Sequence, residues 1–150
     1  MKYRILCIGK IKDFYYKDEI SNIQRCIAGK QNSLEILEFQ DEKIPENLSA
    51  KNKNIILEKE GKRILNKLSN RDFVVALCIE GKEMTTNQHK EIIRKATDDG
   101  YDSITYLIGG SLGLMDELKN RANLKLSFSK MTFPHQLMRM VLCEEIANII

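Results

Sequence analysis

The most constraining feature of this chain is a pair of apolar runs, each of which leads directly into a loop. The runs cover residues 104–108 (ITYLI) and 124–128 (LKLSF), and the loops that follow cover 109–113 (GGSLG) and 129–134 (SKMTFP). Open α/β sheets bind ligands at the carboxyl ends of their strands, where such loops lie side by side. Because the two loops are close in sequence, they predict one shared pocket.

Apolar runs and helical patterns alternate along the rest of the chain. The predicted strands are 3–9, 33–39, 72–79, 104–108 and 124–128, and the predicted helices are 13–28, 55–68, 85–100, 115–121 and 134–150. Strand 72–79 is the most continuously apolar and is expected at the centre of the sheet, buried on both faces. The alternation predicts an α/β protein with a mostly parallel sheet and helices on both faces, in a single domain over residues 1–150.

Polar segments separate these elements. Residues 40–54 (QDEKIPENLSAKNKN) are predicted to form a solvated surface loop. The alternative is a lid or an RNA-contacting flap, because Lys43, Lys51 and Lys53 lie in this segment. A turn is predicted at 80–83 (EGKE), and Thr85 with Gln88 predicts a capping box at the start of the next helix.

Charge and cysteine usage narrow the possible functions. A net charge of +3 permits an RNA partner without arguing for one. No run is long enough for a signal peptide or a membrane span, so we expect a cytoplasmic protein with reduced thiols and no membrane partner. The four cysteines form no CxxC pair and the only histidines, His89 and His135, are far apart, so no metal site is expected.

The glycines of the first loop do not match the common nucleotide-binding motifs. A dinucleotide fingerprint follows the first strand as G-x-G-x-x-G, whereas Gly109-Gly110-x-x-Gly113 follows the fourth. A phosphate-binding loop and the G-x-S-x-G element of serine hydrolases are both absent. Glycine pairs are often simple tight turns. Here the second loop lies nearby, which favours the interpretation that the glycines allow a ligand to approach the backbone closely.

The start of the last predicted helix carries two candidate polar residues. His135 lies near the positive end of the helix dipole, which disfavours its charged form. Arg139 is four residues later and therefore on the same face. Together they predict a polar patch suited to an RNA phosphate. The alternatives are a histidine that merely caps or packs, and an arginine paired with Glu144 or Glu145 on the surface.

Taken together, these residues resemble the ribosomal RNA large subunit methyltransferase H family, a branch of the SPOUT methyltransferases. The resemblance lies in Tyr106-Leu107-Ile108-Gly109-Gly110-x-x-Gly113-Leu114 and in Leu126-Ser127-x-Ser129-x-Met131-Thr132-x-Pro134-His135-Gln136-Leu137-x-Arg139. It extends to Gly9-Lys10, to Glu60-Gly61 and to Leu77-x-x-x-Gly81-Lys82. The run from 107 to 139 is specific to this family.

The resemblance implies a fold, an activity and partners. The C-terminal part of the sheet, about residues 72–150, would be tied in a deep trefoil knot, and the protein would be a homodimer. The enzyme would use S-adenosylmethionine to methylate N3 of a pseudouridine in helix 69 of 23S rRNA, on the assembled ribosome. Attack by the imide nitrogen on the sulfonium methyl needs no metal, and positioning would be the main catalytic contribution.

The resemblance also implies positions for the site residues. The cofactor pocket would be lined by Leu77, Gly109, Gly110, Phe128, Ser129, Lys130, Met131, Thr132 and Phe133. His135 and Arg139 would lie near the substrate. Cys78 stands where the family usually has an aspartate, and the chain stops at Ile149-Ile150 without the family's Tyr-His tail. Two alternatives are a knotted ribosome-binding protein impaired in catalysis by the missing tail, and a nucleotide-binding module unrelated to methylation.

The last helix is predicted to form the dimer interface. It carries more apolar residues than one sheet face requires, on both sides of the helix. These residues are Leu137, Met138, Val141, Leu142, Ile146, Ile149 and Ile150.

Overall fold

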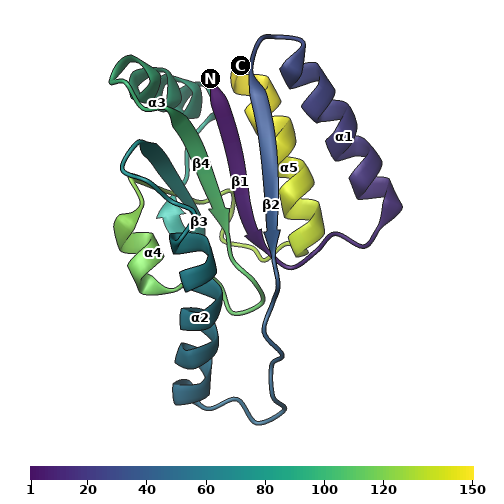
Figure 1. The fold of residues 1–150 in the computed structure, drawn as a ribbon, viewed down its shortest axis with the longest axis vertical. Coiled ribbons are helices and arrows are strands. Elements are labelled where there is room, and N and C mark those ends of the chain that lie inside the picture. The colour runs from purple at the N-terminus through teal and green to yellow at the C-terminus, as the bar shows by residue number, and fades with distance from the viewer.

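The computed structural model describes all 150 residues as five strands and five helices that alternate along the chain (Figure 1). The strands are β1 (Lys2–Ile8), β2 (Ser33–Phe39), β3 (Asp72–Lys82), β4 (Ser103–Ile108) and β5 (Leu124–Leu126). The helices are α1 (Phe14–Ala28), α2 (Ala50–Leu65), α3 (Thr86–Asp98), α4 (Asp116–Arg121) and α5 (His135–Ile149). The strands form one parallel sheet in the order β2-β1-β4-β3-β5, which confirms the predicted α/β class.

Alternate residues of each strand build two separate cores, one on each face of the sheet. On β1, Ile5 and Cys7 belong to the core formed with α1, α3 and α5, whereas Leu6 and Ile8 belong to the core formed with α2 and α4. This period of two is what a strand with two covered faces requires. Helices therefore cover both faces of the sheet, as predicted.

The centre of the sheet is β4, and the prediction that residues 72–79 form the central strand is wrong. All six residues of β4 are buried. β3 lies one position further out and is buried only through Ala76. Beyond Ala76 the strand continues through the residues predicted as a turn, and its pairing with β5 has a register break between Leu77 and Lys82. Residues 77–80 at this end of the strand line a cavity, and Leu77 also packs against the core.

The polar segment after β2 is shorter than predicted. The Ser49 side chain accepts a hydrogen bond from the backbone N–H of Asn52 at 3.1 Å and caps α2, which begins at Ala50. Lys51 and Lys53 consequently lie on a helix, and only Lys43 stays in the loop. The predicted capping box of α3 is confirmed by reciprocal hydrogen bonds between Thr85 and Gln88.

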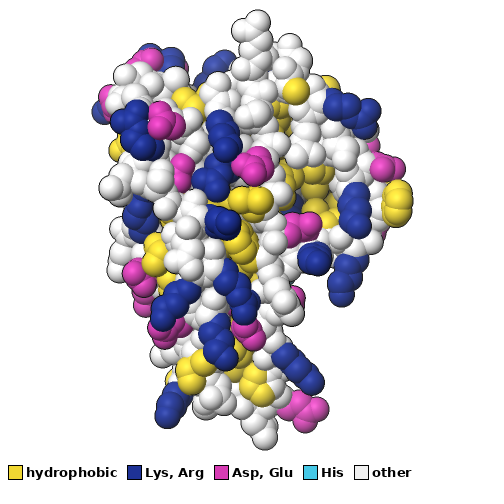
Figure 2. All heavy atoms as spheres, viewed as in Figure 1, with side chains coloured by type: hydrophobic (Ala, Val, Ile, Leu, Met, Phe, Trp, Pro, Cys, Tyr) yellow, Lys and Arg dark blue, Asp and Glu magenta, His cyan; other side chains and the backbone are white.

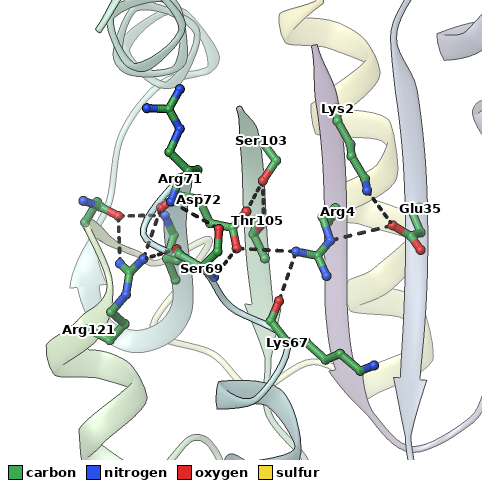
Figure 3. A network of polar contacts seen from close by, with 12 residues as sticks. Lys2, Arg4, Glu35, Lys67, Ser69, Arg71, Asp72, Ser103, Thr105 and Arg121 are labelled. Atoms are coloured by element: carbon green, nitrogen blue, oxygen red, sulfur yellow. Dashed lines mark hydrogen bonds and ion pairs between the residues drawn. The ribbon is translucent and has the colours of Figure 1, made fainter. Parts of the chain in front are cut away.

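A polar network joins the strands at their amino ends (Figure 3). The Asp72 carboxylate accepts hydrogen bonds from the Ser69 backbone N–H at 2.8 Å, from Arg4 at 3.4 Å and from the Ser103 hydroxyl. Arg4 also forms an ion pair with Glu35 at 3.7 Å. The network therefore links β1, β2, β3 and β4 at the end of the sheet opposite the two loops.

Helix α5 returns the chain from the β5 edge to the face covered by α1 and α3. It packs against both helices. The buried His89 ring joins α3 to this arrangement, because its two nitrogens contact Tyr106 Oη at 2.8 Å and Glu145 Oε1 at 3.0 Å. The segment 127–134 makes the crossing at the carboxyl ends of the strands. The trefoil knot over about residues 72–150 stays a prediction.

Candidate functional site

The two loops singled out in the sequence line one cavity at the carboxyl ends of β3, β4 and β5. Its volume is about 390 Å³. Its walls are the end of β3, the glycine loop with its flanks, Lys119 of α4, the segment from the end of β5 onward, and the start of α5. The lining residues are Leu77, Cys78, Ile79, Glu80, residues 108–114, Lys119, residues 126–129, residues 131–133, His135 and Met138.

Most of the residues predicted for the cofactor pocket lie in this cavity. Those that line it are Leu77, Gly109, Gly110, Phe128, Ser129, Met131, Thr132 and Phe133. Lys130 is exposed and is not among the lining residues. Ile79 and Glu80 also line the cavity and were not predicted, although they follow Leu77 at the carboxyl end of a parallel strand and could have been found by that rule. Cys78, noted in the sequence only as the replacement of an aspartate, lines the cavity as well. Nothing in the sequence indicated Lys119 of α4.

The glycine loop folds back on itself. The Gly113 N–H donates to the Gly110 carbonyl at 3.0 Å, and Gly113 has a φ of +88°, which favours glycine. A Cβ on Gly109 would lie 2.3 Å from the Gly113 carbonyl oxygen. Gly109 is therefore required by the loop's own packing. This packing is a second reason for the glycine, beside the approach of a ligand that the sequence predicts.

The second loop presents apolar side chains at the mouth of the cavity. The Ser127 hydroxyl donates to the Ser129 carbonyl, and the Ser129 hydroxyl accepts from the Met131 N–H, each at 3.0 Å. These bonds give the loop a fixed turn. Met131 is 74% exposed and Phe133 is also exposed. The cavity thus has an apolar rim that a flat ring could contact.

His135 is the first residue of α5 and lines the cavity. Burial, and after it the positive charge of Arg139, lower the pKa of His135 below its ordinary value. At neutral pH the imidazole is therefore uncharged and has one nitrogen free to accept a proton.

Arg139 lies behind the cavity instead of in it. The residue is only 1% exposed, and its guanidinium donates to the Glu38 carboxylate at 2.9 Å and to the Ile8 carbonyl at 2.8 Å. Glu38 also accepts the Ile11 backbone N–H at 2.6 Å. The face of α5 that carries Arg139 packs onto the ends of β1 and β2. The prediction of an exposed patch for RNA phosphate is therefore wrong for Arg139, as is its surface pairing with Glu144 or Glu145.

The end of β3 places a thiol and a carboxylate at one side of the cavity. Cys78 lines the cavity, and burial raises the pKa of its thiol above the ordinary value. Glu80, two residues further along β3, pairs with Lys119 at 2.5 Å, and this hydrogen bond lowers the pKa of Glu80. An ionised carboxylate and an ammonium group therefore lie at one side of the cavity.

Charges on the surface are mixed in sign. Figure 2 shows Lys and Arg side chains over α2 with Asp and Glu side chains among them. No helix is long and apolar enough to cross a membrane. No group of three or more His, Cys, Asp or Glu side chains is placed to hold a metal ion.

A five-stranded parallel sheet with its cavity between two loops at the carboxyl ends defines a ligand-binding α/β protein. The chain belongs to the family described as predicted SPOUT methyltransferase, whose model matches residues 1–148. It is therefore a methyltransferase and uses a methyl donor.

Among its relatives are proteins named ribosomal RNA large subunit methyltransferase H. Those of Streptococcus uberis and Streptococcus thermophilus are 46% and 47% identical to this chain. The one of Streptococcus mutans is 44% identical. Each match extends over 146 residues, which is 97% of this chain and 91% of the relative.

Proposed function

We propose that this chain transfers a methyl group from S-adenosylmethionine to ribosomal RNA. The observation that carries the proposal is the cavity between the glycine loop and residues 126–133, in a chain 46% identical to an enzyme named for that reaction. We extend the proposal to N3 of a pseudouridine in helix 69 of 23S rRNA on the assembled ribosome, which the resemblance implies. Such a substrate would place the protein in the cytoplasm.

The residues present fit the proposed cofactor. A volume of about 390 Å³ lies within the range of small-molecule sites, which runs from about 300 to 1,000 Å³. Leu77, Leu114, Leu126 and Phe128 offer apolar contact to an adenine ring. The glycine loop, residues 109–113, presents its backbone to the cavity, and a Cβ on Gly109 would disrupt this loop. Glu80 and Lys119, which pair with each other, add one negative and one positive charge at the side of the cavity.

The proposed chemistry needs a positioned nucleophile and a place for one proton. S-adenosylmethionine would supply an electrophilic methyl group on its sulfonium sulfur. The substrate nitrogen must lose its proton as it attacks, and the uncharged imidazole of His135 is the acceptor that lines the cavity. Arg139 would act from behind by holding the first turns of α5 in place. Positioning of this kind contributes up to roughly 7–11 kcal/mol.

A transfer assay tests the proposal. Ribosomes lacking the modification would be incubated with the protein and tritiated S-adenosylmethionine, and label would be counted in 23S rRNA. Calorimetry with S-adenosylhomocysteine would measure the cofactor site separately. We expect label in the rRNA and a one-to-one binding isotherm per chain. Absence of both would contradict the proposal. Binding without transfer would support the cofactor site and contradict the proposed rRNA substrate.

We also propose that the protein is a homodimer through α5. The apolar residues of this helix divide into two sets in the structure. Leu142, Ile146 and Ile149 are buried inside the chain, whereas Val141 is 36% exposed and Leu137 and Met138 are half-buried. The outward set supports an interface that is smaller than the sequence suggests.

A further inference from the structure

A second and smaller cavity lies behind the glycine loop, next to α2. Its volume is about 200 Å³. Its walls are residues 41–44 of the loop after β2, Ile56 and Glu60 of α2, and Ser111 and Leu112 of the glycine loop. Ser111 and Leu112 also line the larger cavity. The tip of the glycine loop is therefore the partition between the two cavities.

Glu60 is the buried acid of this second cavity. Its residue surface is 5% exposed. One carboxylate oxygen, Oε2, accepts the Glu42 backbone N–H at 2.9 Å. The other, Oε1, has no donor from the protein and faces the glycine loop, since a Cβ on Gly110 would lie 3.2 Å from it. Burying a carboxylate costs free energy, and this one is hydrogen-bonded to the loop after β2 and lies beside the glycine loop.

The groups around Glu60 have opposite effects on the pKa of its carboxyl group. Burial raises the pKa of Glu60, and Asp41 and Glu42 raise it further, whereas the hydrogen bond from the Glu42 N–H and the charge of Arg63 lower it. Arg63 also donates to the Gln40 carbonyl at 2.5 Å and pairs with the Glu42 side chain. Lys43 lines the same cavity. The glycine loop has no charged side chain, and Glu60 is the charged group that lies next to Gly110.

The glycine loop is confined from this side by close contacts. A Cβ on Gly110 would lie 3.0 Å from Ile8 Cγ2 at the end of β1. A Cβ on Gly61, next to Glu60, would lie 2.5 Å from the Met115 side chain, just after the loop. Helix α2 thus lies close to the chain on both sides of the loop tip, and Glu60 is the polar side chain that it places beside Gly110.

We propose that Glu60 is a positioning residue for the glycine loop. It holds residues 40–42 and Gly110 against each other, so that residues 109–113 keep the shape that lines the larger cavity. This rests on the proposed function in one respect, because the glycine loop is taken to bind S-adenosylmethionine. Glu60 itself lies in the smaller cavity and acts on the cofactor only through the loop.

Two variants and a matched control test the assignment. Glu60→Ala removes the carboxylate, Glu60→Gln keeps its shape and one acceptor oxygen, and Glu58→Ala removes an exposed acid from the same helix. Hydrogen exchange in the ligand-free proteins would report on the loops directly. Calorimetry with S-adenosylhomocysteine would report on the cofactor site.

In Glu60→Ala the Glu42 N–H loses its acceptor, so we expect the amides of residues 41–44 to exchange about ten-fold faster, the size of one lost charge-assisted hydrogen bond. The amides of residues 109–113 should be accelerated by a similar factor, because the truncated side chain no longer packs beside Gly110. Affinity for S-adenosylhomocysteine should fall by about the same factor. Glu60→Gln keeps the shape and a neutral acceptor for the Glu42 N–H, so it should restore most of both, and Glu58→Ala should change neither. Unchanged exchange in the glycine loop of Glu60→Ala would overturn the proposal, as would equal acceleration across β1 and β4. If the wild-type protein binds no S-adenosylhomocysteine, the proposed function fails while the exchange result still decides the role of Glu60.

Discussion

The Arg139 guanidinium and the Glu38 carboxylate are 2.9 Å apart, although 101 residues separate them in the sequence. The pair joins the first half of α5 to β2, and the second hydrogen bond of Arg139 joins it to the last residue of β1. His135 lies one helical turn before Arg139 and lines the cavity. The ion pair therefore fixes the helix turn that presents His135.

Replacing Arg139 should destabilise the fold. Removing one partner of a buried pair typically costs about 3–5 kcal/mol. Glu38 is 32% exposed on its side chain, so water would compensate part of the loss, and we expect Arg139→Met to lose about 2–3 kcal/mol. Urea unfolding measures this. Arg94→Met is the control, because Arg94 forms only exposed ion pairs on α3 and should leave the midpoint nearly unchanged. Equal midpoints for Arg139→Met and wild type would show that the pair is unimportant.

Gly109 should tolerate no side chain at all. A Cβ there overlaps the Gly113 carbonyl, so Gly109→Ala must open the glycine loop. We expect affinity for S-adenosylhomocysteine to fall by at least about ten-fold, the loss expected when one positioned contact is removed. Gly100→Ala is the control: Gly100 has a φ of +91° and open space around it. That variant should lose about 1 kcal/mol of stability from backbone strain and bind normally. Normal binding of S-adenosylhomocysteine by Gly109→Ala would show that the glycine loop is not part of the cofactor site.

The sequence predicted the order of the elements and the shared pocket because both depend on local patterns. The apolar runs of the strands, the capping box at Thr85 and the loops after 108 and 128 are visible within short windows. The role of Arg139 was not predictable in this way. Helical spacing placed it near His135, but its partners, Glu38 and the Ile8 carbonyl, are brought to it only by the sheet order and by the return of α5. The same holds for Glu60 and Gly110.

The stability of the protein should depend on the protonation of His135. Burial and the charge of Arg139 lower its pKa in the folded state. Between that lowered pKa and the unfolded value of about 6.5, the unfolded chain binds more protons, so stability rises with pH and is lost as the pH falls. The free energy of unfolding should therefore drop less from pH 8 to pH 5.5 in His135→Asn than in wild type. Lys130→Ala, outside the cavity, should keep the full drop, and identical drops in all three proteins would contradict the lowered pKa.

The four cysteines should differ sharply in reactivity. Burial raises the pKa of Cys7 to about 11 and that of Cys143 to about 12, whereas Cys26 is exposed. Since the thiolate is the reactive form, iodoacetamide at pH 8 should modify Cys26 first and Cys78 more slowly. Cys7 and Cys143 should react only in denaturant. Mass spectrometry of the modified peptides measures the order, and rapid modification of Cys143 in the native protein would contradict the packing of α5 against β1.

A charge placed on the outer face of α5 should separate the proposed dimer. Val141 is partly exposed and lies one turn after Leu137, so a carboxylate at this position keeps its access to water in a single chain. In an apolar interface the same carboxylate would be buried without a partner, which costs several kcal/mol. Sedimentation velocity at micromolar concentration should show wild type at about twice the chain mass of 17.3 kDa and Val141→Glu at the mass of one chain. Asn54→Glu, an equal charge change on exposed α2, should stay dimeric. A monomeric wild type would contradict the proposed homodimer. A dimeric Val141→Glu would show that the interface lies on another face, because burying an unpaired carboxylate inside an apolar interface costs enough free energy to separate the dimer.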